Sequence, residues 1–172
     1  MSRLGLLLTA LLALAAAGCG GTKTVTKTVT VDKSANAVGS PAVQVQFGYI
    51  KSLTRKGDGF ELKFDPAWFL MGETANAAAA EDGAVEPGEP VPNDNYVVDE
   101  GHRLLTYKVP ASARVAVLTE GPDGTPITVS QLAQLVAGTN PLPKPLFEPL
   151  STGFWIRVRI DTVRALDQQY HP

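Results

Sequence analysis

The residues best suited to chemistry gather in one polar stretch, where Asp94, Asp99 and His102 lie within nine positions of one another. A carboxylate beside a histidine is typical of general acid–base catalysis, and carboxylate oxygens at such spacing also suit calcium. The ordered pattern of an EF-hand loop is missing, and the sequence assigns no serine nucleophile to His102. A loop of solvated acidic residues is the simpler interpretation, and a small hydrolase is an alternative.

A second group of candidates lies near the C-terminus, where Phe-Trp-Ile-Arg-Val-Arg-Ile predicts a strand with one apolar face. The other face carries Trp155, Arg157 and Arg159. An aromatic ring beside two guanidinium groups suits carboxylates, glycans or partner proteins. A covering helix, or ion pairs with acids such as Asp167, would give these residues a structural role instead. With Asp94, the three side chains are the candidate binding residues.

Motifs and composition exclude several function classes. The chain has no Gly-x-Ser-x-Gly, Ser-x-x-Lys, Gly-x-Gly-x-x-Gly or His-Glu-x-x-His motif and no phosphate-binding loop. Lys and Arg number 15 against 17 Asp and Glu, and a net charge of −2 gives no broad basic field for nucleic acid. We therefore expect no cofactor, no metal and no nucleic-acid partner.

The N-terminus predicts export. After Arg3, residues 4–17 form an apolar run, which is shorter than the roughly 20 residues that a membrane-spanning helix needs. Residues 1–18 are therefore predicted to be a cleaved signal peptide. The end of this run, Ala-Ala-Gly-Cys, resembles the lipobox of bacterial lipoproteins, with Ala16 where leucine is commonest. The resemblance implies a lipidated Cys19, whose acyl chains would anchor the protein stably to the membrane.

Cys19 is the only cysteine, so the chain cannot form an internal disulfide. Residues 19–42 combine this cysteine with a stretch rich in Thr, Lys and Val that holds nothing large to bury. We interpret it as a flexible tether, although its alternation also permits an edge strand. Residues 43–172 are then predicted to form one β-rich domain.

The elements of this domain follow from alternation, turns and helix caps. Apolar residues alternate over 43–49 and 60–64 around a Lys-Gly-Asp-Gly turn, which predicts a hairpin. Asp65 as a cap and Pro66 in the first turn predict a helix over 66–82, with Trp68 on its buried stripe. The capping box Thr-Val-Ser-Gln predicts a short second helix, which follows position 128.

Further strands are predicted over 96–98, 104–109, 114–118, 154–160 and 163–170. Six or seven short strands with two inserted helices indicate an α+β fold. The expected architecture is a small, strongly bent antiparallel β-sheet or a partly closed β-barrel.

Several motifs resemble a group of uncharacterised exported proteins and lipoproteins of actinobacteria and their relatives. The motifs are Asp-Pro-Ala-Trp-Phe-Leu from position 65, Ala-Ala-Glu-Asp-Gly from 79, Pro-Asn-Asp-x-Tyr from 92, Arg-Leu-Leu from 103 and Asp-Gln-Gln-Tyr from 167. The resemblance covers most of residues 47–172. It implies an exported location and this architecture, and it supplies no activity and no site.

The sequence therefore favours a lipoprotein on the extracytoplasmic face of the cell membrane, with a non-enzymatic domain that binds an envelope protein or glycan. Two alternatives stay open. One is a small envelope hydrolase that uses Asp94, Asp99 and His102. The other is a carrier of a small apolar ligand, which requires a cavity inside the barrel.

Overall fold

The computed structural model describes residues 42–101 and 103–171. Contacts divide the chain into two units, residues 1–37 and 38–172, and all described residues belong to the second unit. Every buried residue among them lies between Phe47 and Gln168. The second unit therefore has a complete core of its own. The predicted signal peptide, Cys19, the tether up to residue 41 and His102 lie outside the described residues.

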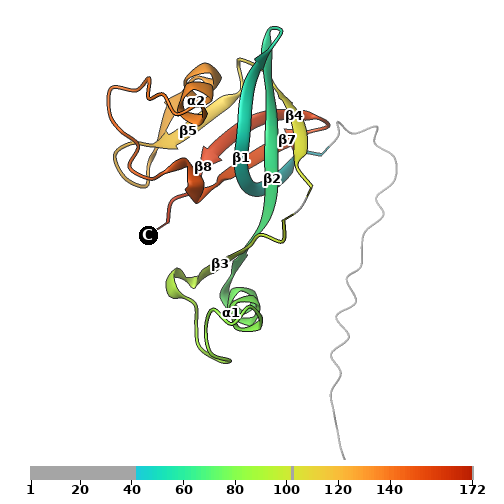
Figure 1. Cartoon of the computed structure of the whole chain (residues 1–172), viewed down its shortest axis with the longest axis vertical. Coiled ribbons are helices and arrows are strands. Elements are labelled where there is room, and N and C mark those ends of the chain that lie inside the picture. The colour runs from blue at the N-terminus through green and yellow to red at the C-terminus, as the bar shows by residue number, and fades with distance from the viewer. Residues whose placement is uncertain (1–41, 102, 172) are drawn as a thin grey trace, which may run out of the picture. The chain divides into compact units, whose positions relative to one another are not determined.

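A long hairpin runs through the centre of the fold (Figure 1). Its strands are β1 (Gln44–Lys56) and β2 (Gly59–Met71), which pair antiparallel. Gly57 makes the turn with a φ of 62°, a conformation that glycine adopts at little cost. The register shifts between Ile50 and Ser52, and such a bulge bends the hairpin. The predicted hairpin is present, and both strands are longer than expected.

Five strands close into a barrel. β2 pairs with β4 (Leu105–Val109), β1 pairs with β7 (Phe154–Arg159), and β7 pairs with β8 (Thr162–Gln168), all antiparallel. The ring closes where β4 and β8 pair in parallel, with Lys108 opposite Thr162. The order around the barrel is β1-β2-β4-β8-β7. The predicted barrel is therefore confirmed in outline, but the expectation of a purely antiparallel sheet is wrong.

Three strands and two α-helices extend the barrel. β5 pairs with β8 in parallel and with β6 antiparallel, and β3 pairs with the end of β2. The described chain has eight strands, more than the six or seven predicted, because the glycine and proline of β6 resemble turn residues. None of its helices has the length and apolar character needed to cross a membrane. The bounds are β3 Asn95–Val98, β5 Arg114–Leu118, β6 Gly124–Ile127, α1 Gly72–Glu81 and α2 Val129–Val136, with 3-10 turns η1 at Pro92–Asp94 and η2 at Leu150–Thr152.

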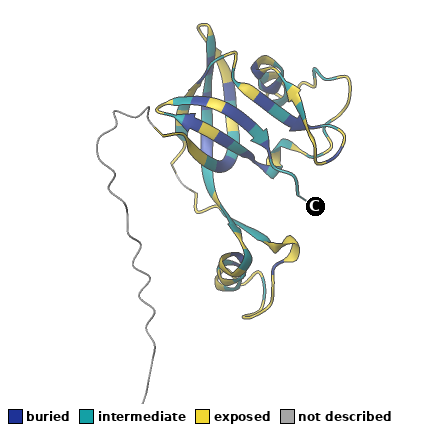
Figure 2. Cartoon of the chain, turned by 180° about the vertical axis from the view of Figure 1, so that it is seen from behind, coloured by how far each residue is buried: buried dark blue, intermediate teal, exposed yellow. Residues whose placement is uncertain are grey.

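Large apolar side chains fill the barrel. Buried positions alternate with exposed ones along its strands (Figure 2), as expected where one face of each strand points inward. Gly48 allows β1 and β2 to approach closely, since a β-carbon at position 48 would lie 2.1 Å from the backbone oxygen of Asp65 and 2.9 Å from Phe64 Cζ. The largest fully buried side chains are those of Phe64, Phe154, Leu62, Leu118, Leu132, Ile156 and Leu166.

The predicted helix over residues 66–82 is wrong in its first half, which continues β2. Pro66 fits into the strand because pairing with β4 ends at Phe64 and pairing with β3 begins at Trp68. Trp68 consequently lies on a strand, and 61% of its surface is exposed. The predicted stop is confirmed: α1 ends just before Gly83, whose φ is 72°.

The second predicted helix, α2, has the expected capping box. Thr128 Oγ1 accepts a hydrogen bond from the backbone N–H of Gln131 at 3.1 Å. Gln131 Oε1 accepts one in return from the N–H of Thr128 at 2.9 Å. These bonds satisfy two of the free donors at a helix start, and Leu132 anchors α2 in the barrel core.

Residues 72–101 leave the barrel after β2 and rejoin it shortly before β4; we call them the acidic excursion. They contain α1, η1 and β3, and their core is a small cluster around Ala75, Ala79 and Val91. This segment has eight acidic residues and no lysine or arginine. The rest of the described chain, residues 42–71 and 103–171, has 11 Lys and Arg against 8 Asp and Glu. The two regions therefore carry net charges of opposite sign.

Candidate functional site

β1 and β2 separate at one end of their hairpin. Their last paired residues are Phe47 and Ala67, beyond which β1 pairs only with β7, and β2 pairs with β3. Because β1 and β3 lie on opposite sides of β2, no described strand pairs with the β1-facing edge of residues 68–71. A groove of about 420 Å³ opens at this point. Its lining residues are Val45, Gln46, Phe47, Pro66, Ala67, Trp68, Phe69, Leu105 and Trp155.

Three packed aromatic rings form one wall of this strand-divergence groove. The ring of Phe47 lies 5.0 Å from that of Phe69 and 5.1 Å from that of Trp155, between centroids. Phe69 and Trp155 are 5.5 Å apart. The indole N–H of Trp155 donates to Gln169 Oε1 at 2.6 Å, which fixes the ring. Tilted and edge-on aromatic pairs of this kind are favourable beyond their buried area, so the wall is preorganised.

The rims of the groove are exposed and apolar. Trp68 is 61% exposed and Val45 is 56% exposed. Large apolar side chains gathered around a groove mark binding surfaces, and strand edges without partners offer backbone donors and acceptors. An extended polypeptide uses both features when it adds a strand to a sheet. The groove is therefore chemically suited to an extended apolar segment.

The predicted face of Trp155, Arg157 and Arg159 is present on β7, but its members have different surroundings. Trp155 belongs to the aromatic wall. Arg157 forms an ion pair with Asp167, which also contacts Arg114 Nη2 at 2.6 Å. Arg159 forms no ion pair with any other described residue. The structural alternative accordingly holds for Arg157, while Trp155 and Arg159 line separate hollows.

The predicted acidic site is spread over several elements. Asp94 lies in η1, and Asp99 follows β3 and accepts a hydrogen bond from the N–H of Gly101 at 3.2 Å. His102 is outside the described residues, so its part in an acid–base pair stays a prediction. Within the described ranges, no three His, Cys, Asp or Glu side chains are placed to hold a metal ion.

One carboxylate of the barrel is buried and paired. Asp65 is only 7% exposed, and its Oδ2 lies 2.9 Å from Lys51 Nζ, while its buried Oδ1 has no hydrogen-bond partner. The bond to Asp65 raises the pKa of the Lys51 amine. Burial, and then the carboxylate of Asp99, raise the pKa of the neighbouring Tyr49 phenol. The protonated amine of Lys51 thus partners the buried Asp65 in the barrel wall, close to the aromatic wall of the groove.

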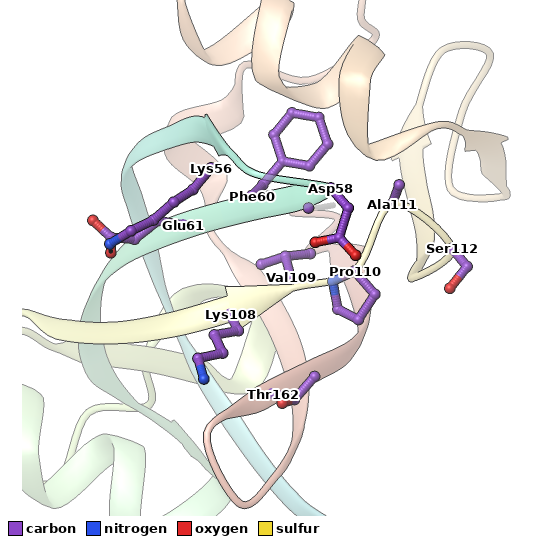
Figure 3. A pocket seen from close by; sticks show the side chains of 11 residues that line it. Lys56, Asp58, Phe60, Glu61, Lys108, Val109, Pro110, Ala111, Ser112 and Thr162 are labelled. Atoms are coloured by element: carbon purple, nitrogen blue, oxygen red, sulfur yellow. Dashed lines mark hydrogen bonds and ion pairs between the residues drawn. The ribbon is translucent and has the colours of Figure 1, made fainter.

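Two hollows near the end of β4 share Lys108. A space of about 700 Å³ lies between the β1–β2 turn and the end of β4, where Lys108 lies apart from the ion pair of Lys56 with Glu61 (Figure 3). A second space of about 330 Å³ shares Lys108 and surrounds the β7–β8 turn. Its lining residues are Lys108, Arg159, Ile160, Asp161, Thr162 and Arg164. Cations outnumber the single acid there, so this surface suits an anionic ligand.

Sequence patterns did not indicate that Trp68 and Val45 line a groove or that Lys108 belongs to a basic hollow. The Asp-Pro dipeptide hides Trp68 behind a helix-start signal. One signal could have located the groove: every second residue from Phe60 to Leu70 is apolar, Pro66 included, which favours a single long strand. The position of Lys108 beside the β7–β8 turn depends on the parallel closure of the barrel, which no local pattern encodes.

No family model matches the chain, and no curated protein and no solved structure matches it either. Its function must therefore be argued from the strand-divergence groove, the charges and the N-terminal pattern.

Proposed function

We propose that this protein is an extracytoplasmic lipoprotein, anchored to the cell membrane through Cys19, whose barrel domain is a non-enzymatic module that binds an extended segment of an envelope protein. The sequence pattern up to Cys19 supports the anchor. The strand-divergence groove carries the binding role, because it combines exposed apolar side chains with two strand edges that have no described partner.

The strand order supports a binding role in general. The ring β1-β2-β4-β8-β7, with its parallel closing pair, corresponds to the five-stranded Greek-key barrel of the OB type. That architecture presents ligand surfaces on its strands and loops. Since a fold does not determine a function, the choice of partner rests on the groove itself.

The lining of the groove favours a polypeptide over a glycan. Sugar hydroxyls need several free polar side chains around the aromatic platform. Apart from the indole N–H groups of the two tryptophans, only Gln46 among the lining residues has a polar side chain, and its Oε1 already accepts a hydrogen bond from the Tyr107 hydroxyl at 2.9 Å. The Trp155 indole N–H is likewise engaged by Gln169. Backbone groups of the two strand edges therefore supply most of the polar recognition.

The same geometry gives less support to a carrier with its ligand inside the barrel. The rings of Phe64 and Phe154 and the side chain of Leu62 are fully buried in that space. An apolar small molecule would have to occupy the strand-divergence groove instead, in competition with a peptide.

Site-specific photocrosslinking in cells tests the binding role. A photoreactive phenylalanine analogue replaces Trp68 in the full-length protein, and the matched control places it at Thr54, which is also exposed but lies on the paired part of the hairpin. We expect a discrete adduct from position 68 only, and its loss when Val45→Arg is added. Peptides from the adduct should bind the purified protein, and N-methylation of alternate backbone amides should weaken that binding. Equal adducts at both positions, or none, would overturn the proposal.

Mass spectrometry of the N-terminal peptide tests the anchor separately. We expect cleavage before Cys19 and a diacylglyceryl mass on this residue, and release of a Cys19→Ser variant from the membrane fraction. An unmodified thiol on the mature protein would contradict the anchor and leave the groove proposal intact.

A further inference from the structure

Three cations around the β7–β8 turn have no acidic partner in the part of the chain that the structure describes. Lys108, Arg159 and Arg164 form no ion pair with any other described residue, and Asp161 is the only acid in the hollow that they line. At the apex of the turn, Ile160 is 71% exposed with a φ of 56°, a conformation that a β-branched residue rarely adopts. The turn therefore presents an apolar tip surrounded by positive charge.

The described chain begins beside this tip. Gln44 pairs with Val158, so Val43, itself 54% exposed, comes next to the turn that follows β7. Residues 20–41 separate this point from Cys19, and 22 residues reach at most about 80 Å when fully extended. A lipid at Cys19 would consequently tether the domain through a point of attachment that lies beside the basic turn.

The charge distribution of the domain is polarised. All eight acids of the acidic excursion lie on the segment that follows β2, and the remainder of the described chain has an excess of cations. An anionic surface would attract the basic turn and repel the excursion. Both forces favour one orientation of the domain.

We propose that the β7–β8 turn docks on the anionic lipid headgroups of the membrane, with Lys108, Arg159 and Arg164 at the phosphates and Ile160 in the interface. This inference rests on the proposed anchor for its setting, since the tether holds the domain near the bilayer. In the docked orientation, repulsion between the acidic excursion and the anionic headgroups would hold the excursion off the lipid surface. The domain would then stand on the membrane in a fixed pose instead of diffusing at the end of its tether.

The expected affinity of the free domain is low and depends on charge. Each cation near an anionic leaflet strengthens binding roughly fivefold, which is about 1 kcal/mol, and the effect declines within a Debye length. A tether raises the effective concentration of headgroups to about the millimolar range. Weak docking is therefore sufficient once the lipid anchor is in place.

Vesicle binding by residues 38–172 tests the docking without the lipid and without the lysines of the tether. This segment contains the whole described core, so it is expected to fold alone. At millimolar lipid we expect cosedimentation with vesicles of phosphatidylglycerol and phosphatidylcholine, and none with phosphatidylcholine alone. We also expect release at 0.5 M salt, where the Debye length is about fourfold shorter than at 0.03 M. Because the anchor is absent, failure here overturns docking and does not touch the anchor.

Matched variants locate the surface. Arg164→Gln should weaken binding roughly fivefold, and the triple variant Lys108→Gln, Arg159→Gln, Arg164→Gln roughly a hundredfold. Lys144→Gln removes one charge from an exposed ion pair with Glu120 and should change nothing. Unchanged binding of the triple variant, with an unaltered circular dichroism spectrum, would overturn the assignment. So would binding to a soluble anionic polysaccharide without binding to vesicles.

The orientation of the docked domain can be measured separately by fluorescence quenching. In a Cys19→Ser background, fluorophores are attached through Ile160→Cys or Glu86→Cys, which is possible because the chain has no other cysteine. Lipid-borne quenchers should quench the label at position 160 and leave the label at position 86 bright. Equal quenching at both positions would contradict the proposed pose.

Discussion

The barrel and the acidic excursion differ in what holds them together. The barrel buries large side chains such as Phe64, Phe154 and Leu166 completely, whereas the buried residues of the excursion are Ala75, Ala79 and Val91. Because apolar stabilisation scales with the area removed from water, the excursion gains far less from its core than the barrel does. The comparison indicates a stable platform that carries a segment able to open by itself.

The two regions also treat their acidic residues differently. The barrel buries Asp65 and pairs it with Lys51. In the excursion, Asp82 contacts solvent and accepts a hydrogen bond from the Tyr96 hydroxyl at 3.1 Å. Desolvation, and then this bond to Asp82, raise the pKa of Tyr96. With no cation in the segment, its charges repel one another, and that repulsion adds to the weakness of its core.

The largest difference between the two regions should be in the stability lost when a core side chain of each is truncated. Phe64→Ala removes a fully buried ring at the centre of the barrel and should lower the free energy of unfolding by about 3–5 kcal/mol. Leu70→Ala, at a half-buried position packed on the excursion cluster, should cost less than half as much. Urea denaturation followed by circular dichroism measures both. Equal losses would mean that the two regions form one cooperative unit.

The ion pair of Lys51 with the buried Asp65 should give the next largest effect on the free energy of global unfolding. Lys51→Met leaves the Asp65 carboxylate buried without its partner and should cost about 1–2 kcal/mol, a value reduced because Lys51 is half exposed. The raised pKa of Lys51 means that the pair contributes fully below pH 10.5 and loses its contribution as pH rises through the higher folded value. The stability gap between wild type and variant should therefore close at strongly alkaline pH.

A matched exposed pair provides the control for that effect. Lys144→Met breaks the contact with Glu120, in which both side chains are more than half exposed, and should change stability by less than about 0.5 kcal/mol. Chemical denaturation at pH 7 and pH 11 compares the two variants. A gap for Lys51→Met that stays constant over this range would contradict the role of the lysine charge.

A helix-breaking substitution tests directly whether the excursion unfolds independently of the barrel. Ala77→Pro lies at an exposed position inside α1, where proline removes a helical hydrogen bond and costs about 3 kcal/mol locally. We expect loss of amide protection in α1 and β3, and a change of less than about 1 kcal/mol in the unfolding of the barrel. Hydrogen exchange with mass spectrometry measures protection in the excursion and in the barrel separately, and Ala77→Ser is the control. Loss of protection throughout the barrel strands would refute independent opening.

Local patterns predicted much of the barrel and little of the site. The strand over 114–118 and the capping box at Thr128 are confirmed because alternation and cap chemistry act within a few residues. The helix predicted from Pro66 is wrong because the gap between β4 and β3, a tertiary feature, lets proline stay in the strand. The groove depends on where the pairing of Phe47 with Ala67 ends, and the basic turn depends on parallel closure. Both are long-range features that spacing along the chain does not encode.

Salt should produce the smallest effect and the one most specific to the excursion. Raising ionic strength from 0.01 to 0.15 M shortens the Debye length from about 30 Å to about 8 Å and screens the repulsion among its eight acids. Like-charge neighbours on a helix cost a few tenths of a kcal/mol, so amide exchange in α1 should slow about two- to threefold. Barrel strands, where both signs of charge occur, should change little.

Removing one acidic charge from α1 tests the same effect of salt on amide exchange. Glu81 closes α1, where the helix dipole disfavours an acid and the last turn has no basic residue. Glu81→Gln should therefore slow exchange in α1 at low salt and reduce its response to added salt, while exchange in the barrel stays constant. An unstructured peptide measured in parallel corrects for the effect of salt on the exchange chemistry. If the barrel strands respond as strongly as α1, charge repulsion does not weaken the excursion in particular, and its small apolar core alone accounts for its lower stability.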